Sequence, residues 1–176
     1  MPFSEPEKVL KQFFIGKDWR IADFGAGSGG YTLGAARYTH DGRVYAIDIQ
    51  KGLLAKIKKD AEQAGLSNVD VVWGDVEEPG GSHLKEDAVD AVILANILFQ
   101  VEEKKKVIEE AKRVLRSRGR VLVVDWTDSF GGLGPAQESV FSKEKARELF
   151  ESLGFEYEHG IEAGEHHYGV IFKKNK

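Results

Sequence analysis

The chain has 176 residues, a net charge of −4 and no cysteine. This length suits one α/β domain with a full core, so we expect a single domain over residues 1–176. The lack of cysteine excludes disulfides, thiolate metal sites and cysteine nucleophiles, and it is compatible with the cytoplasmic location that we expect. The acidic balance offers no basic field to nucleic acid or anionic membranes, and no apolar run approaches the roughly 18 residues of a membrane span.

The first 16 residues predict an amphipathic helix that ends at Gly16. Ser4 and Glu7 have the spacing of a capping box, with Pro6 in the first turn. The apolar residues on one face of this helix are Val9, Leu10, Phe13 and Phe14. The helix either packs on the domain as ordinary core or covers a ligand cleft, because it leads directly into the first strand.

Residues 19–38 predict a strand, a Gly-rich turn and a helix. The apolar run from Trp19 breaks into glycines at Gly25 and continues as a helix-compatible segment to Tyr38. Glycines in such a turn allow a positive φ or the close approach of a ligand to the backbone. The helix start adds unpaired N–H groups and a partial positive charge, so this turn is the first candidate binding site.

The motif in this turn is consistent with two kinds of ligand, a dinucleotide and S-adenosylmethionine. The dinucleotide pattern G-x-G-x-x-G is satisfied by Gly25, Gly27 and Gly30, and Asp48 follows about 20 residues on, where a ribose-binding acid would lie. The same stretch is D-x-G-x-G-x-G, beginning at Asp23 and ending at Gly29. A carboxylate at Asp23 would repel a pyrophosphate but attract the ammonium and sulfonium of S-adenosylmethionine. Asp23 therefore favours S-adenosylmethionine, and a turn without any ligand is the remaining alternative.

The run Asp23-Phe24-Gly25-Ala26-Gly27-Ser28-Gly29 resembles the first motif of class I S-adenosylmethionine-dependent methyltransferases. The resemblance extends over nearly the whole chain, and it is strongest to the generic small-molecule group that includes the quinone-biosynthesis C-methyltransferases. It implies an α/β, Rossmann-like fold: a doubly wound, mostly parallel seven-stranded sheet with helices on both faces and a C-terminal antiparallel hairpin. It also implies S-adenosylmethionine as cofactor and S-adenosylhomocysteine as product.

A second strand is predicted over residues 42–49, with an acid near its end. Ligands of open parallel sheets lie beyond the carboxyl ends of the strands, so Asp48 would accept hydrogen bonds from two ribose hydroxyls, with Ile49 beside it. The alternative is that Asp48 only caps the next helix, predicted over residues 51–64.

A third strand over residues 69–73 is followed by Gly74, Asp75 and Val76. The resemblance implies that Asp75 accepts from the adenine amino group and that the backbone N–H of Val76 donates to the ring. Glu77 and Glu78 are expected to be solvent-exposed charges. Residues 79–83 form a loop, so the usual crossover helix is short or absent, and His83 is expected to be a surface histidine.

A fourth strand over residues 88–96 is nearly continuous in apolar residues, as a central parallel strand should be. Asn96 ends it at the ligand edge, and an amphipathic helix over residues 102–116 follows. The family's Lys-Pro-Gly-Gly turn is replaced by residues 116–119, before a fifth strand over 120–126. The expected cofactor-binding residues are Asp23, Phe24, Gly25, Ala26, Gly27, Gly29, Asp48, Ile49, Gly74, Asp75, Val76 and Asn96.

The last third of the chain predicts a helix and a hairpin. Ser142 caps a helix that runs to about Leu153, and strands over residues 155–161 and 166–172 form an antiparallel hairpin. Such a hairpin fits a methyltransferase better than a dehydrogenase. His166 and His167 would point to opposite faces of a strand and are expected to be structural.

The acceptor side is predicted from aromatic residues at the same edge. Phe99 follows the fourth strand, Trp126 ends the fifth, and Phe130 lies in the next loop, with Phe14 as a further candidate cover. These rings form either core or an apolar wall for the acceptor. Asn96 and Asp125, at the ends of strands four and five, are a poor ligand set for a hard cation, so no metal is expected.

These observations predict methyl transfer from S-adenosylmethionine to an unidentified acceptor. We expect a small molecule, a protein acceptor stays open as an alternative, and the acidic balance disfavours nucleic acid. The sulfonium already activates the methyl group, so the protein mainly aligns an in-line nucleophile and excludes water, and no catalytic residue stands out. The alternatives are a non-catalytic or regulatory S-adenosylmethionine-binding protein and an NAD-dependent oxidoreductase. The sequence does not indicate an oligomeric state.

Overall fold

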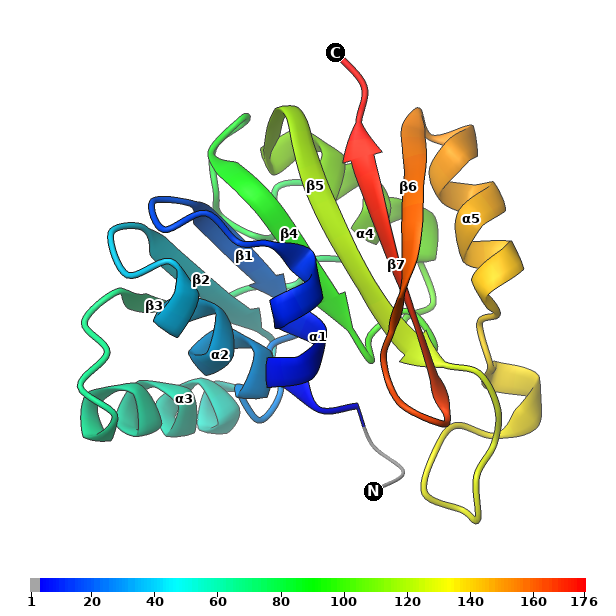
Figure 1. Ribbon diagram of the computed structural model, residues 1–176, viewed down its shortest axis with the longest axis horizontal. Coiled ribbons are helices and arrows are strands. Elements are labelled where there is room, and N and C mark those ends of the chain that lie inside the picture. Colours follow the sequence, from blue (N-terminus) through cyan, green and yellow to red (C-terminus); the bar gives the residue numbers. More distant parts are fainter. Residues whose placement is uncertain (1–3) are drawn as a thin grey trace.

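The computed structural model describes residues 4–176, which form one seven-stranded sheet in the order β3-β2-β1-β4-β5-β7-β6 (Figure 1). The strands are β1 (Arg20–Phe24), β2 (Arg43–Asp48), β3 (Val69–Trp73), β4 (Val89–Ala95), β5 (Leu115–Trp126), β6 (Phe155–Glu162) and β7 (His167–Lys174). Strands β1 to β5 pair in parallel, and β7 is antiparallel to both β5 and β6. The predicted doubly wound sheet with a C-terminal antiparallel hairpin is therefore confirmed.

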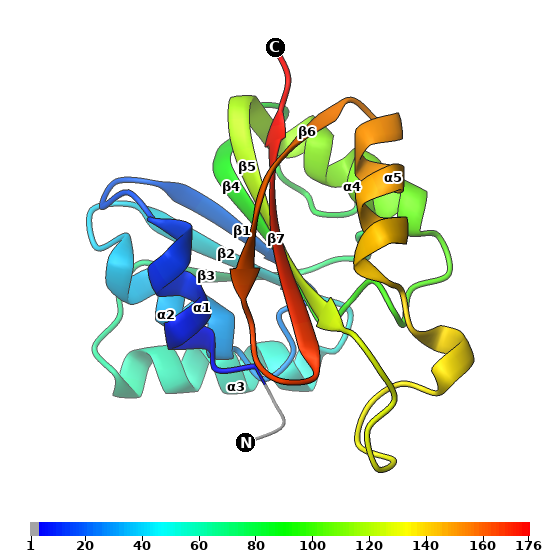
Figure 2. The ribbon, with the colours of Figure 1, turned by 45° about the vertical axis from the view of Figure 1, so that its right-hand side comes forward.

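Helices cover both faces of the sheet (Figures 1 and 2). One face carries α1 (Pro6–Phe13), α2 (Gly30–Tyr38) and α3 (Lys51–Gln63), and the other carries α4 (Lys104–Val114) and α5 (Lys143–Ser152). Alternate strand residues feed the two layers: Ile93 and Leu122 pack toward α1 and α2, whereas Leu94 and Val123 pack toward α4 and α5. Because the helices cover the two faces of the sheet, the polar turns that follow the central strands lie along its carboxyl edge.

The connection from β3 to β4 contains no helix between residues 74 and 88, as predicted. Its polar backbone is anchored instead by the buried carboxylate of Glu110 on α4, which accepts from Gly80 N at 3.0 Å and Ser82 Oγ at 2.5 Å. Burial opposes the charge of Glu110, but the hydrogen bonds from Arg113, Ser82 and Gly80 outweigh it and lower its pKa to about 2. A buried ion pair therefore replaces the crossover helix as the support of this loop.

Several predicted boundaries differ from the structure, and the first helix ends at Phe13 rather than at Gly16. The α1 N-cap is Glu5, without a side-chain cap, so the predicted Ser4 capping box is wrong: the Ser4 hydroxyl accepts from the Tyr31 hydroxyl at 3.0 Å instead. β5 begins at Leu115, earlier than expected. Its pairing with β4 skips residues 116–119, and Arg118 has a φ of 62°, so the predicted turn is present as a bulge inside the strand.

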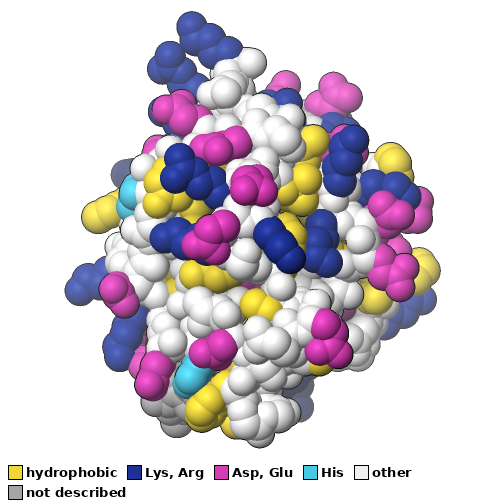
Figure 3. Space-filling view, turned by 90° about the vertical axis from the view of Figure 1, so that its right-hand side faces the viewer, with side chains coloured by type: hydrophobic (Ala, Val, Ile, Leu, Met, Phe, Trp, Pro, Cys, Tyr) yellow, Lys and Arg dark blue, Asp and Glu magenta, His cyan; other side chains and the backbone are white. Residues whose placement is uncertain are grey.

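The C-terminal third follows the prediction closely. The Ser142 side chain caps α5 by accepting from Lys145 N at 3.2 Å, and Gly154 follows the helix with a φ of 86°. Lys and Arg side chains alternate with Asp and Glu over the face that carries α5, so this face has no field of one sign (Figure 3). Within residues 4–176, no helix is long and apolar enough to cross a membrane.

Helix α1 leads away from the carboxyl edge of the sheet (Figure 1). Its start lies at the carboxyl edge, next to Gly30 and Tyr31, and the carbonyl of Phe13 near its end accepts from Arg120 Nη1 at 3.0 Å, at the amino end of the regular part of β5. Arg120 lies six strand residues, or roughly 20 Å, before Trp126 on β5. Phe14 follows Phe13 and is 75% exposed, so it lies toward the amino end of β5, and the expectation that Phe14 could close over Trp126 is wrong.

Candidate functional site

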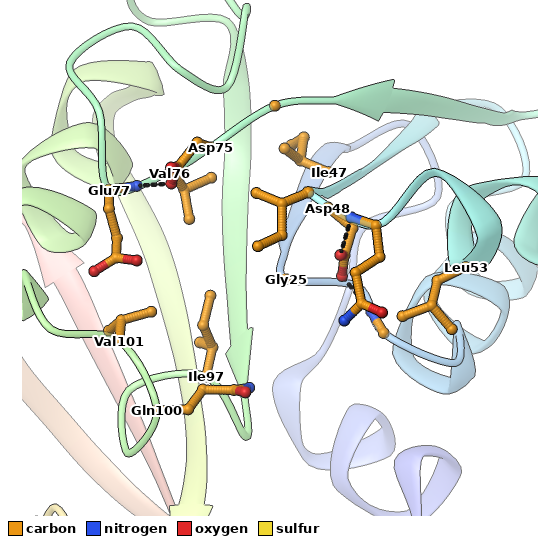
Figure 4. A pocket seen from close by; sticks show the side chains of 14 residues that line it. Gly25, Ile47, Asp48, Leu53, Asp75, Val76, Glu77, Ile97, Gln100 and Val101 are labelled. Atoms are coloured by element: carbon orange, nitrogen blue, oxygen red, sulfur yellow. Dashed lines mark hydrogen bonds between the residues drawn. The ribbon is translucent and has the colours of Figure 1, made fainter.

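A cleft of about 200 Å³ opens at the carboxyl edge of the sheet, beyond the ends of β1, β2 and β3 and against the segment that follows β4 (Figure 4). It is lined by Gly25, Gly27, Ile47, Asp48, Ile49, Gln50, Leu53, Gly74, Asp75, Val76, Glu77, Ile97, Gln100 and Val101. This is the topological position where open parallel sheets bind ligands, because the chain leaves β1 and β4 in opposite directions across the sheet.

The Gly-rich turn after β1 forms one wall of the cleft. Gly25 and Gly27 have φ values of 68° and 55°, and the N–H groups of Gly25 and Ala26 both donate to the Ile47 carbonyl, at 2.8 and 3.1 Å. A Cβ on Gly25 would lie 2.6 Å from Ile97 Cδ1, whereas a Cβ on Gly27 would meet nothing closer than 3.9 Å. Gly25 is therefore needed for packing, and Gly27 leaves its space to the cleft.

Asp48 joins the ends of β1 and β2. One carboxylate oxygen accepts from Gly27 N at 3.0 Å and the other from Gln50 N at 2.9 Å. Each oxygen keeps a lone pair for a further donor. Asp48 lies before Gln50, the N-cap residue of α3, so it supports the helix start and also faces the cleft. The position of Asp48 is thus compatible with both interpretations from the sequence, the ribose acceptor and the support of the helix start.

Asp75 and Val76 form the opposite wall (Figure 4). Asp75 Oδ1 accepts from Glu77 N at 2.9 Å, and its second oxygen has no hydrogen-bond donor among residues 4–176. Gly74 is required by close packing, because a Cβ there would collide with the Gly81 carbonyl. The turn after β3 therefore presents an acidic oxygen and an apolar side chain to the same space.

Glu77 also belongs to this wall, so the expectation that it is only a solvent-exposed charge is wrong. Its Oε1 accepts from the backbone N–H groups of Glu102 and Glu103, both at 2.9 Å, at the start of α4. An anion at a helix N-terminus accepts from the unpaired N–H groups and interacts favourably with the positive end of the helix dipole. Glu77 thereby ties the β3 turn to the segment after β4 and fixes the width of the cleft.

Asp23 lies behind the Gly-rich turn and does not line the cleft. It is buried and accepts from Thr32 Oγ1 at 2.7 Å, which joins β1 to α2. Burial raises its pKa to about 7, with the Thr32 hydrogen bond opposing the rise and the nearby Asp48 carboxylate adding to it. Its charge therefore depends on pH near neutrality.

Asn96 carries an unpaired buried atom. The residue follows β4 with a φ of 56°, its N–H donates to the Val124 carbonyl at 2.8 Å, and its Oδ1 is buried without a hydrogen-bond partner. Buried polar atoms are nearly always paired, so this oxygen is suited to a donor brought by a ligand.

The remaining predicted cofactor residues support the turn from behind or stand at its mouth. Phe24 and Ala26 are buried in the core, and Gly29 is the N-cap of α2, packed against Ile57. Ile49 is exposed at the mouth of the cleft. Sequence reasoning missed Gln50 and Glu77, although each lies two residues after a predicted acid; it also missed Ile47, Leu53, Ile97, Gln100 and Val101, which carry no motif.

The predicted acceptor residues lie beyond the cleft, at the ends of β5 and β7. Trp126 is 5% exposed, and its ring packs on His167 at a centroid distance of 4.2 Å. Phe130 is 37% exposed and stacks on His166 at 4.0 Å. Each histidine is thus paired with one of the predicted aromatic residues, and His166 lies just before β7 rather than within it.

Phe99 is connected to this region through Asp125, the last residue but one of β5. Asp125 is buried and accepts from Phe99 N at 3.2 Å and from Trp126 N at 2.8 Å. Burial raises its pKa to about 6, while the backbone hydrogen bonds oppose the rise. Within residues 4–176, no group of three or more His, Cys, Asp or Glu is placed to hold a metal ion.

Comparison with known proteins identifies the class. The profile of the family described as "Methyltransferase domain" matches residues 15–172, and the chain belongs to this family. A SAM-dependent methyltransferase of Aquifex aeolicus has a similar structure, with a TM-score of 0.87 and 28% identity, covering 98% of this chain and 90% of that one. The fold is thus that of the Rossmann-like, S-adenosylmethionine-dependent methyltransferases.

Two curated relatives match a shorter part of the chain. A Methanosarcina mazei protein named "Probable cobalt-precorrin-6B C(15)-methyltransferase (decarboxylating)" is 29% identical over 49% of this chain and 50% of its own length. The arsenite methyltransferase of Homo sapiens is 32% identical over 60% of this chain and 30% of its own. The chain thus spans half or less of these relatives. A structure described as the [4+2]-cyclase SpnF also shares the fold, with a TM-score of 0.81 and 19% identity over 97% of this chain and 79% of that one, so the fold alone does not fix the reaction.

Proposed function

We propose that the protein transfers a methyl group from S-adenosylmethionine to a small-molecule acceptor. The observation that carries the proposal is the cleft in which Gly27, Asp48 and Asp75 face the same space. Membership of the methyltransferase family supports the reaction, and the relatives named for cobalt-precorrin and arsenite support a small acceptor.

The residues along the cleft fit the parts of this cofactor in order. Asp75 and Val76, after β3, would hold the adenine, and Asp48, the last residue of β2, would accept from the two ribose hydroxyls. Gly27 would lie against the methionine part, whose ammonium would find the unpaired Oδ1 of Asn96 after β4. The assignments of Asp75, Asp48 and Asn96 each pair a donor of the cofactor with an acceptor oxygen that the structure leaves available.

The size of the cleft indicates where the reacting group lies. Pockets for ligands of this class usually measure about 300–1,000 Å³, and this cleft measures about 200 Å³. The sulfonium end would therefore extend past Gly27 toward Asn96 and the end of β5. S-adenosylmethionine supplies the activated methyl group, and the protein supplies alignment and the exclusion of water.

The start of α1 supplies part of that exclusion in this proposal. Ser4 contacts Tyr31, and Pro6 lies against Gly30, so the N-terminal segment adjoins the first turn of α2. None of the residues of α1 lines the cleft itself. The N-terminal helix would therefore cover the methionine end rather than the adenine end. Residues 1–3 of the chain, which precede this helix, lie outside the described part.

Calorimetry and a transfer assay test the proposal. S-adenosylmethionine and S-adenosylhomocysteine should bind the protein, and NAD should not; binding of NAD alone would favour the oxidoreductase alternative. With methyl-labelled S-adenosylmethionine and the small-molecule fraction of a cell extract, label should appear in a product. Cofactor binding without transfer to small molecules, proteins or nucleic acids would favour the non-catalytic alternative instead.

A further inference from the structure

The carboxyl edge of the sheet continues beyond the residues assigned to the cofactor. The sheet order places the ends of β3, β2, β1 and β4 in sequence, and the next ends are those of β5 and β7. The cofactor-facing residues Asp75, Gly27 and Asn96 follow β3, β1 and β4, and Asp48 is the last residue of β2. A cofactor that lies across these four ends would therefore present its transferable group toward Trp126 and the start of β7.

A carboxylate–imidazole pair lies at that place. His166 precedes β7, and its Nδ1 is 2.9 and 3.1 Å from the two carboxylate oxygens of Asp128. Its carbonyl accepts from Thr127 N at 2.9 Å, and the Phe130 ring stacks on the imidazole with an interplanar angle of 24°. The ring is thus fixed, and its Nε2 has no hydrogen-bond partner among residues 4–176. An imidazole held by a carboxylate through Nδ1 keeps Nε2 as a proton acceptor.

The neighbouring His167 gives a second, independent indication of a ligand. It is 5% exposed, and neither of its ring nitrogens has a hydrogen-bond partner. Burial and the adjacent His166 lower the pKa of His167, so its ring is neutral, with one donor and one acceptor unused. Within the described chain, the unpaired buried side-chain atoms belong to His167 and Asn96, and both residues lie at this edge. Because the cofactor ammonium is assigned to Asn96 Oδ1, the two ring nitrogens of His167 are the buried atoms left for a polar group of the acceptor.

The distances suit a small acceptor. The end of β4 and the start of β7 are separated by β5, which makes two strand spacings, or about 10 Å. A molecule with two rings is long enough to reach across most of this distance.

We propose that His166 is the general base of the methyl-transfer site, that Asp128 is its positioning residue, and that the acceptor reacts through an oxygen or nitrogen that carries a proton. This proposal rests on the proposed methyl transfer. As the acceptor atom forms its bond to the methyl carbon, the carbon–sulfur bond breaks and its electron pair stays on sulfur. The acceptor proton moves to His166 Nε2, the Asp128 carboxylate stabilises the resulting imidazolium, and the proton then passes to water.

The test uses His166→Ala with methyl-labelled S-adenosylmethionine and the acceptor isolated from the labelled small-molecule fraction. General bases contribute about 10²–10⁴-fold, so kcat should fall by this factor. The Kd for S-adenosylhomocysteine should stay within about threefold, because His166 does not line the cleft. Free imidazole added to the variant should restore part of kcat, which a purely structural role would not allow.

His40→Ala is the matched control. His40 also places Nδ1 near a carboxylate, at 3.1 Å from Asp41 Oδ1, but it is exposed and lies in the turn between α2 and β2. This variant should keep the wild-type kcat.

Two failures can be told apart. If the wild type transfers no label to any acceptor, the proposed methyl transfer is refuted, and the proposed role of His166 as general base is refuted too. If the wild type is active and His166→Ala keeps kcat within about threefold, or loses it without recovery in imidazole, only the role of His166 is overturned.

Discussion

Asp48 Oδ2 accepts a hydrogen bond from the backbone N–H of Gly27 at 3.0 Å, so the acid at the end of β2 holds the Gly-rich turn that follows β1. The same carboxylate faces the cleft and would accept from the ribose. Binding and loop geometry are therefore coupled through one side chain. A ligand that engages Asp48 also fixes Gly27, the one glycine of the turn whose missing Cβ leaves open space.

Asp48→Ala should weaken the binding of S-adenosylhomocysteine by roughly 2–4 kcal/mol, because two ribose donors lose their charged acceptor. The N–H groups of Gly27 and Gln50 also lose their partner, so the unfolding free energy should fall by about 1–2 kcal/mol while the transition stays cooperative. Titration calorimetry and urea unfolding measure the two effects.

Asp60→Ala is the control for Asp48→Ala, because Asp60 forms only an i,i+4 pair with Lys56 on the outer side of α3. It should leave the dissociation constant unchanged. An unchanged dissociation constant in Asp48→Ala as well would refute the ribose assignment and leave Asp48 with its role at the start of α3 alone.

Gly27→Ala should abolish binding of S-adenosylhomocysteine, because the new methyl group would occupy the part of the cleft where the cofactor approaches the protein backbone. A positive φ at a residue with a Cβ also costs about 1–2 kcal/mol of stability. Gly65→Ala is a close match, since Gly65 has a φ of 70° and open space but lies after α3, away from the cleft. Both variants should lose similar stability, and only Gly27→Ala should lose binding. Normal binding by Gly27→Ala would mean that the turn is not the cofactor cradle.

The sequence predicted the elements that local signals define. Ser142 and Gly154 carry the chemistry of a helix cap and a helix end, and α5 lies between them as expected. The acids after β2 and β3 were found because strand ends are visible in the sequence. The early start of β5 was not predicted, because residues 115–119 join the sheet only through the pairing of Leu115 with Val89, before a bulge.

The motifs of the candidate site could be predicted from the sequence, but the side chains that hold these motifs in place could not. Glu77 was taken for a solvent charge because nothing local shows that it caps α4, which begins some 25 residues later in the chain. The pairing of His166 with Asp128 likewise depends on the return of β7 beside β5, a contact between residues far apart in sequence. Tertiary placement, not residue type, gives these side chains their roles.

Asp23 makes stability depend on pH. Its pKa is about 7 in the fold and 3.8 as an ordinary carboxyl, so between roughly pH 4 and 7 the folded state holds a proton that the unfolded state lacks. The stabilising contribution is complete below pH 4 and is lost as pH rises through 7. Asp23→Asn removes this titration, so relative to wild type it should gain on the order of 1–4 kcal/mol between pH 4 and pH 8. Urea unfolding at several pH values measures the gain; parallel profiles for the two proteins would contradict it.

The acceptor wall needs a variant that separates packing from binding. Trp126 is buried against His167, and a Cβ on Gly134 would lie 2.8 Å from its ring. Trp126→Ala should therefore cost about 3–5 kcal/mol of stability and would confuse a core role with a substrate role. Phe130 is a better probe, because its ring is partly exposed and stacks only on His166 among the aromatic contacts of the described chain.

Phe130→Ala should leave the Kd for S-adenosylhomocysteine within about threefold and the unfolding free energy within about 1 kcal/mol. Because the ring borders His166 at the acceptor edge, its loss should raise the acceptor KM by about tenfold, the effect of roughly 1.4 kcal/mol of lost contact. Leu133→Ala is the control from the same loop, since Leu133 is exposed and its N–H merely donates to the Phe130 carbonyl. Steady-state kinetics with the isolated acceptor decides the matter. If both variants keep the wild-type KM, the aromatic residues at the ends of β5 and β7 are packing elements, and the acceptor must bind nearer to Asn96.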